Sequence, residues 1–133
     1  MAEHVAQWSK DPSRKVGSVI VNRYNRIVSV GYNGFPEGVL DIDERYTDRE
    51  TKYLFVNHAE RNALDNATVD LHGHSLYVTM FPCSECAKSI IQKGITRVII
   101  STKTSSGDID GPPFHFDVTK KMFEEANVVT ILY

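Results

Sequence analysis

The sequence has only two cysteines and no run of about 18 apolar residues, the length that a membrane-spanning helix needs. Two cysteines cannot supply a zinc site of four thiolates within one chain. Thiols kept free for a metal fit a reducing compartment better than a disulfide scaffold does. The N-terminal stretch also lacks the apolar core of a signal peptide. We therefore expect a cytoplasmic protein that neither enters nor crosses a membrane.

The chain also lacks an excess of charge of either sign. Its 15 basic and 17 acidic side chains give a formal net charge of −2, and the two signs are interspersed. No broad basic field is available to hold a nucleic-acid backbone, so we expect no nucleic-acid partner. Repeats and low-complexity segments are absent too. A length of 133 residues with 41% hydrophobic content predicts a single domain over residues 1–133.

Two short segments carry the chemistry, His58-Ala59-Glu60 and Pro82-Cys83-Ser84-Glu85-Cys86. Cys83 and Cys86 are three residues apart, which places both thiols on one face of the first turn of a helix, where the helix dipole favours thiolates. His58 would complete a set of three protein ligands. A catalytic zinc ion keeps its fourth position for water, whereas a structural zinc ion usually has a fourth side chain. The pattern predicts a catalytic Zn²⁺ site.

Glu60 follows His58 too closely for both side chains to point the same way on a helix, so we expect it beside the metal. A carboxylate there can take a proton from activated water and deliver it to a substrate nitrogen. His-x-Glu followed by Pro-Cys-x-x-Cys is the signature of zinc deaminases. Taken singly, the cysteine pair could be a redox pair or half of a structural zinc site, and the histidine an ordinary polar residue. Their combination favours the catalytic interpretation.

Periodicity and turn residues predict alternating elements in the second half of the chain. We expect strands over 16–21, 27–31, 76–80, 97–101 and 128–132, and helices over 2–9, 58–67, 83–93 and 117–126. The glycine-rich segment 31–38 is predicted to be a loop, in which Asn33 could bind a ligand or simply occupy a turn. The charged segment 39–53 is predicted to be an irregular surface excursion, with a lid or an interface as alternatives.

This order predicts an α/β fold of three layers, with a mixed five-stranded sheet and helices on both faces. The first two strands form a hairpin and the later ones are joined by βαβ crossovers. Helices that begin near strand ends present their N-termini at one edge of such a sheet. We expect the zinc ligands at that edge.

Several motifs resemble those of the deoxycytidylate (dCMP) deaminases of the cytidine-deaminase superfamily. They are Ser9-Lys10-Asp11-Pro12 before Lys15-Val16-Gly17, the loop Gly31-Tyr32-Asn33-Gly34-Phe35-Pro36, His58-Ala59-Glu60-Arg61-Asn62-Ala63, and Phe81-Pro82-Cys83-Ser84-Glu85-Cys86-Ala87-Lys88. The resemblance implies the cytidine-deaminase-like fold and zinc-dependent hydrolysis of dCMP to dUMP and ammonia. It also implies that His58, Cys83 and Cys86 bind zinc and that Glu60 is catalytic.

The resemblance implies further contacts. Asn33 and the backbone amide of Ala59 would bind the sugar and base, and Ser9, Lys10 and Lys15 would lie near the phosphate. Many relatives have a tyrosine after the fourth strand, where this chain has Thr102 to Ser106, and Lys103 would take its place. Relatives are commonly hexamers regulated by dCTP and dTTP. The residues implied for that regulation are Tyr32, Gly34, Phe35, Arg45 and Arg49.

Two other functions remain open from the sequence. The first is deamination of a different substrate, such as cytidine, guanine or a tRNA adenosine, although the near-neutral charge argues against tRNA. The second is a zinc-stabilised module that binds nucleotides without catalysis. Glu60 argues against this module, because a structural zinc site has no use for an acid beside an open coordination position.

Overall fold

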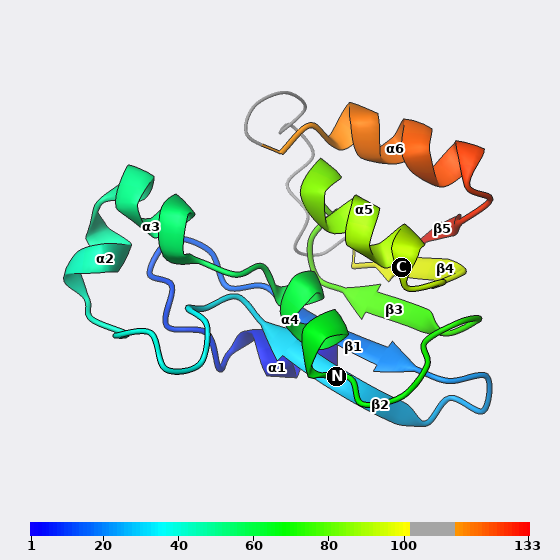
Figure 1. The fold of residues 1–133 in the computed structure, drawn as a ribbon, viewed down its shortest axis with the longest axis horizontal. Helices are drawn as coiled ribbons and strands as arrows, with labels where there is room; N and C mark the ends of the chain where they lie inside the picture. Colours follow the sequence, from blue (N-terminus) through cyan, green and yellow to red (C-terminus); the bar gives the residue numbers. More distant parts are fainter. Residues whose placement is uncertain (102–113) are drawn as a thin grey trace.

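The structure is a computed structural model that describes residues 1–101 and 114–133, and it shows a mixed sheet with helices on both faces (Figure 1). The elements are α1 (Ala2–Ala6), β1 (Gly17–Val21), β2 (Ile27–Tyr32), α2 (Glu44–Thr47), α3 (Arg49–Phe55), α4 (Ala59–Asn66), β3 (Ser75–Val78), α5 (Ser84–Gln92), β4 (Arg97–Ile100), α6 (Phe116–Glu125) and β5 (Val129–Leu132). All five predicted strands are present, each within a few residues of its predicted bounds. The predicted α/β class is confirmed.

The strand order is β2-β1-β3-β4-β5. Strand β1 runs antiparallel to both β2 and β3, whereas β3, β4 and β5 are parallel to one another. The predicted hairpin is therefore β1–β2, and the crossovers pass through α5 and α6. Parallel strands need such crossovers because the end of one strand and the start of the next lie at opposite ends of the sheet. The sheet is mixed because the hairpin adds antiparallel strands to a parallel unit.

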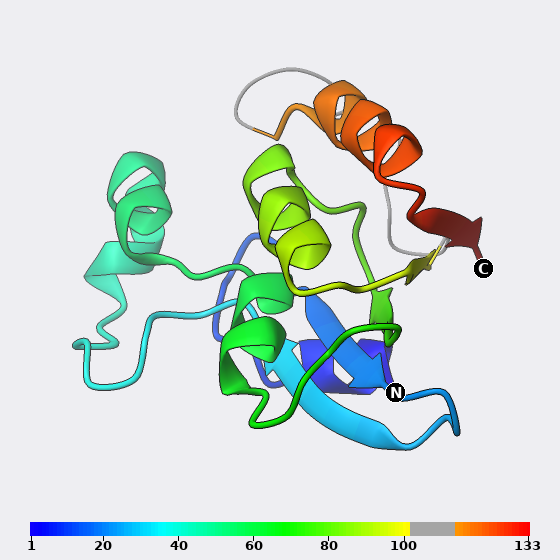
Figure 2. The same ribbon diagram turned by 45° about the vertical axis from the view of Figure 1, so that its right-hand side comes forward.

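Alternate residues of β1 point to two different hydrophobic cores. Val19 and Val21 pack with Val5 of α1 on one face. Ile20 points to the other face and belongs to the main core, which includes residues of α4, α5 and α6. The views of Figures 1 and 2 likewise place α1 and α4 on opposite sides of β1 and β2. The three predicted layers are thus α1, the sheet, and the group of α4, α5 and α6.

Helix α4 lies very close to β1 and β2 because the strands present small side chains to it. The hydroxyl of Ser18 donates a hydrogen bond to the carbonyl of Ala59 at 2.8 Å, and the hydroxyl of Ser29 donates to the carbonyl of Ala63 at 2.7 Å. A Cβ at Gly31 would overlap the backbone of both alanines. These contacts fix the start of α4 against the sheet.

We predict that Gly31→Ala lowers the free energy of unfolding by roughly 1–3 kcal/mol, the usual cost of overpacking. The added methyl group has only helix backbone to displace, so α4 must move away from the sheet. Denaturant unfolding measures this change, and Gly34→Ala is the matched control because its new methyl group would meet only the Tyr32 ring, at 3.8 Å. Equal stability of the two variants would contradict the close contact.

Two predictions about the first half of the chain were wrong. Most of the segment 39–53, predicted to be irregular, is helical: residues from 44 onward form α2 and α3, which Figure 1 shows side by side and away from the sheet. The first helix, predicted over 2–9, ends at Ala6, and Trp8 lies beyond its end with about half of its surface exposed. Among the described residues, no helix has the length and apolar character needed to span a membrane.

Candidate active site

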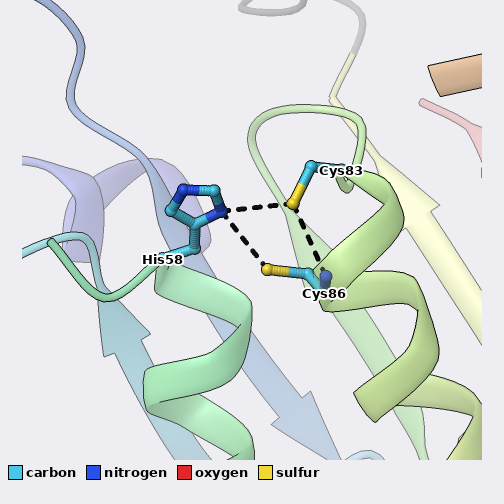
Figure 3. A group of neighbouring side chains, drawn as sticks. All are labelled: His58, Cys83 and Cys86. Atoms are coloured by element: carbon cyan, nitrogen blue, oxygen red, sulfur yellow. Dashed lines mark hydrogen bonds between the residues drawn. The ribbon is translucent and has the colours of Figure 1, made fainter. Parts of the chain in front are cut away.

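The residues of the two predicted motifs meet where α4 and α5 begin. His58 is the N-cap of α4 and Cys83 is the N-cap of α5, so both precede a helix N-terminus. Nδ1 of His58 lies 3.3 Å from Sγ of Cys83 and 3.3 Å from Sγ of Cys86. Figure 3 shows the imidazole from α4 facing the two sulfur atoms from α5. The structure thus brings together three groups that are separated by up to 28 residues in the chain.

The three side chains fit a zinc ion. Their ligand atoms all lie within 4.8 Å of one another, and they form the only such group of three or more in the described part of the chain. Ligands at about 2.0–2.1 Å (nitrogen) and 2.3 Å (sulfur) around a tetrahedral zinc ion are about 3.5 Å apart, close to the distances seen here. Three protein ligands leave one position of the tetrahedron for water. This is the ligand number of a catalytic site.

The two thiols and the imidazole shift one another's pKa. Hydrogen bonds from Cys86 and His58 hold the pKa of Cys83 well below its usual range. The bond to Cys83 raises the pKa of His58, while hydrogen bonding to Cys83 and burial raise the pKa of Cys86. A lowered pKa favours the thiolate form of Cys83, which is the form that binds a metal cation.

Glu60 lies in the first turn of α4, and only 4% of its surface is exposed. Burial raises the pKa of its carboxyl group to about 7. A cation held by the neighbouring ligands would favour the ionised form and lower this value. Glu60 is thus a buried carboxyl group beside the metal ligands, where it can take up and return a proton, as a general acid and base must do.

Glu60 and His58 line a cavity of about 460 Å³. One wall comes from the carboxyl end of β3 and the start of α5, where Met80, Phe81 and Cys83 lie. The opposite walls come from the segment before β1, the end of β2, and α3. Parallel strands of α/β folds place their ligands at this end of the sheet. The volume suits a small molecule such as a nucleotide.

Of the residues that the resemblance implied for substrate binding, Asn33 and Ala59 line the cavity. Ser9 does not line it; its hydroxyl is buried and donates to the carbonyl of Asn33 at 2.7 Å. Lys10 is exposed and pairs with Asp41 at 3.4 Å, and Lys15 is exposed as well. Neither lysine lines the cavity. Lys103 and the other residues of 102–113 lie outside the described residues.

The residues implied for regulation lie in the loop after β2 and in α2–α3. Gly34 pairs with Asn57 just before His58, with an N···O distance of 2.7 Å for the shorter bond. Phe35 stacks on Tyr46 of α2, with ring centroids 4.4 Å apart. Tyr32 is half exposed, Arg45 covers the ring of Phe55, and Arg49 lines the cavity. Their role in regulation stays a prediction.

Several cavity residues had no signal in the sequence. Asp11, Arg14, Lys52, Tyr53 and Phe114 all line the cavity. Lys52 and Tyr53 belong to the charged segment that was predicted to be a surface coil. Asp11 belongs to the Ser9-Lys10-Asp11-Pro12 motif of the resemblance, which assigned it no role. No local spacing marks these residues, because they reach the cavity from segments that lie far apart in the chain.

The fold and site define a class of protein. A His-x-Glu triplet at the start of one helix and a Pro-Cys-x-x-Cys segment at the start of the next, both open to one cavity of an α/β protein, form the active site of zinc-dependent base deaminases. Comparison with known sequences agrees. Residues 1–102 match the cytidine and deoxycytidylate deaminase zinc-binding region, and the chain belongs to this family.

Known relatives support this assignment. An uncharacterised deaminase of Aliivibrio fischeri is 47% identical over 128 residues, which cover 96% of this chain and 85% of that protein. The deoxycytidylate deaminase of Mus musculus is 53% identical over 100 residues, covering 71% of this chain but 56% of the mouse enzyme. A dCMP deaminase of cyanophage S-TIM5, solved with dCMP and dUMP, superposes with a TM-score of 0.75 at 25% identity and covers 99% of this chain and 90% of its own.

Proposed function

We propose that the protein is an enzyme that hydrolyses dCMP to dUMP and ammonia. The observation that carries the proposal is the buried carboxyl group of Glu60, which lies in the cavity beside three metal ligands with one coordination position left. The relatives named as deoxycytidylate deaminases and the phage enzyme solved with dCMP support this substrate. A zinc-stabilised binding module would not need a buried acid at that place.

The residues of the site divide the chemistry among them. His58, Cys83 and Cys86 would hold Zn²⁺, which supplies the Lewis acidity that makes water nucleophilic near neutral pH. Glu60 takes a proton from the water molecule whose oxygen adds to C4 of the pyrimidine. It then gives a proton to the amino nitrogen, so that the C4–N4 bond breaks and ammonia leaves. Met80 and Phe81 form an apolar part of the cavity wall.

We further propose that Asn33 and the backbone amide of Ala59 bind the nucleoside part of the substrate. Both residues line the cavity next to Glu60. The amide of Ala59 is the first of α4, and the first amides of a helix have no intrahelical acceptor. An acceptor atom of the base is the kind of partner that such an amide requires.

The phosphate requires cationic partners. Lys10, Lys15, Lys103 and the hydroxyl of Ser9 stay predictions from the resemblance. The cavity itself offers two arginines: Arg14, which the sequence did not single out, and Arg49, which the resemblance implied only for regulation. Arginine matches phosphate oxygens with two parallel N–H donors, which a lysine cannot do. We propose Arg14 and Arg49 as the main phosphate contacts.

We predict that Arg14→Ala and Arg49→Ala each raise the KM for dCMP by roughly tenfold or more, the effect of one lost charge-assisted hydrogen bond. Activity on deoxycytidine, which has no phosphate, should change little. Steady-state kinetics with both substrates measure the difference, with Arg23→Ala on the distant β1–β2 turn as control and with Lys10→Ala and Lys15→Ala in the same series. Equal kcat/KM for dCMP and deoxycytidine in the unmodified protein would contradict phosphate recognition.

The remaining parts of the proposal rest on the resemblance. They are a single deaminase domain over residues 1–133, a hexameric assembly, regulation by dCTP and dTTP, and a cytoplasmic location. Their support is the family membership; for regulation alone, Phe35 also joins the loop after β2 to α2 by stacking on Tyr46. An effector bound near that loop would shift α2 and, with it, the cavity residues of α3, because α3 follows α2 directly.

A further inference from the structure

Asp11 and Lys52 form a buried ion pair at the wall of the cavity. Nζ of Lys52 lies 3.2 Å from Oδ2 and 3.4 Å from Oδ1 of Asp11. Only 8% of the lysine side chain and 3% of the aspartate side chain are exposed, whereas the other ion pairs among the described residues are at least 44% exposed on both sides. Desolvation offsets most of the attraction in a buried pair, so stability alone does not explain its presence.

The Asp11 carboxylate is a hub of hydrogen bonds. Its Oδ1 atom accepts from the backbone amides of Ser13 at 2.8 Å and Arg14 at 3.3 Å. Its Oδ2 atom accepts from Nδ2 of Asn33 at 3.2 Å. Both oxygens accept hydrogen bonds, as an ionised carboxylate does. The ammonium group of Lys52 balances this negative charge, which would be costly to bury alone. Asp11 thereby joins three parts of the cavity wall, the segment before β1, the end of β2 and α3.

These bonds leave only one orientation for the Asn33 amide. Nδ2 donates its two hydrogens to Asp11 Oδ2 and to the carbonyl of Arg14 at 2.9 Å, and Oδ1 accepts from the backbone amide of Val16 at 2.8 Å. The opposite orientation would place the Asn33 oxygen against two other oxygens. Both amide hydrogens are therefore committed, and one lone pair of Oδ1 is left among the described residues.

We propose that Asp11 and Lys52 are positioning residues that make Asn33 a hydrogen-bond acceptor for a hydroxyl group of the substrate. This inference rests on the proposed function. A deoxycytidine nucleotide has two donors, the 4-amino group and the 3′-hydroxyl. The amino group reacts beside Glu60, and the family resemblance already implies that Asn33 contacts the sugar hydroxyl. The new element is the role of Asp11 and Lys52 in fixing the orientation of Asn33. Lys52 also anchors α3 and with it Arg49 at the cavity.

The test compares dCMP with 2′,3′-dideoxycytidine monophosphate, which lacks the 3′-hydroxyl. The unmodified protein should prefer dCMP, because the analogue leaves the Asn33 oxygen without a donor. In Lys52→Met and Asp11→Asn the ratio of kcat/KM for the two substrates should fall by about tenfold, the effect of one lost hydrogen bond. Lys121→Met, which breaks an exposed ion pair on α6, is the matched control and should keep the ratio.

Two results would overturn the inference. If activity on both substrates falls equally, the pair supports the fold without orienting Asn33. If Lys52→Met raises the KM for dCMP, leaves deoxycytidine unaffected and keeps the 3′-hydroxyl preference, Lys52 binds the phosphate instead. Should a single variant fail to fold because one charge is left buried alone, the double variant Asp11→Asn/Lys52→Met removes both charges.

A second measurement does not depend on activity. Both side-chain amide protons of Asn33 should exchange slowly with solvent in the unmodified protein, measured by ¹⁵N nuclear magnetic resonance, and faster in Asp11→Asn. Fast exchange in the unmodified protein would contradict the inferred orientation. If the unmodified protein does not deaminate dCMP but its Asn33 amide is protected by Asp11, the proposed function fails, the orientation stands, and the assignment of a substrate hydroxyl to Asn33 is withdrawn.

Discussion

Glu60→Gln is expected to lower the kcat for dCMP by roughly 10²–10⁴-fold or more while zinc and nucleotide still bind. Glutamine keeps the shape of the side chain, so the cavity and the three ligands should be preserved. It cannot take a proton from water or give one to the leaving amine. Because only 4% of the Glu60 surface is exposed, solvent is poorly placed to replace the carboxyl group.

The measurement requires three readouts on the same preparation. Metal analysis gives the zinc content, calorimetry gives the affinity for dUMP, and steady-state kinetics give kcat. Glu85→Gln is the matched control, because Glu85 lies on the first turn of α5, is exposed and pairs with Lys88 at 2.9 Å. Full turnover by Glu60→Gln would remove Glu60 from the mechanism. Loss of zinc together with turnover would make Glu60 a structural part of the metal site.

Cys86→Ser is expected to lower zinc affinity by more than about 100-fold, since losing even an outer-shell partner of a metal ligand costs about 10–100-fold. A serine hydroxyl stays protonated near neutral pH and is a poor ligand for zinc. Cys86 is 1% exposed, and no second thiol can replace it because the chain has only two cysteines. Deamination should fall with the zinc content.

Zinc content and thermal unfolding with and without a chelator measure this effect. The chelator should lower the melting temperature of the unmodified protein, since a ligand bound only by the folded state stabilises it. It should change Cys86→Ser much less. Ser89→Ala, one turn further along α5, is the control and should respond as the unmodified protein does. Full zinc content and activity in Cys86→Ser would show that the ligand assignment is wrong.

The chemistry of the site was visible in the sequence because each motif is local. Cys83 and Cys86 are one helical turn apart, and the His58-Ala59-Glu60 triplet fits within the start of one helix. Strands such as β4 were also predicted, because a run of β-branched residues favours a strand. Sequence periodicity therefore gave the alternation of strands and helices, and with it the α/β class and the edge of the sheet where the ligands would meet.

The walls of the cavity were not visible, because they depend on contacts between distant segments. The residues around α3 were interpreted as solvated since they are mostly charged, and local pattern could not show that Lys52 is buried against Asp11, 41 residues away. Such a pair forms only when the tertiary structure removes both charges from water together. The sequence by itself determined the metal ligands and the proton-transfer group. Only the tertiary structure decided which cations reach the cavity and which way Asn33 faces, because orientation follows from hydrogen bonds among segments that the chain order keeps apart.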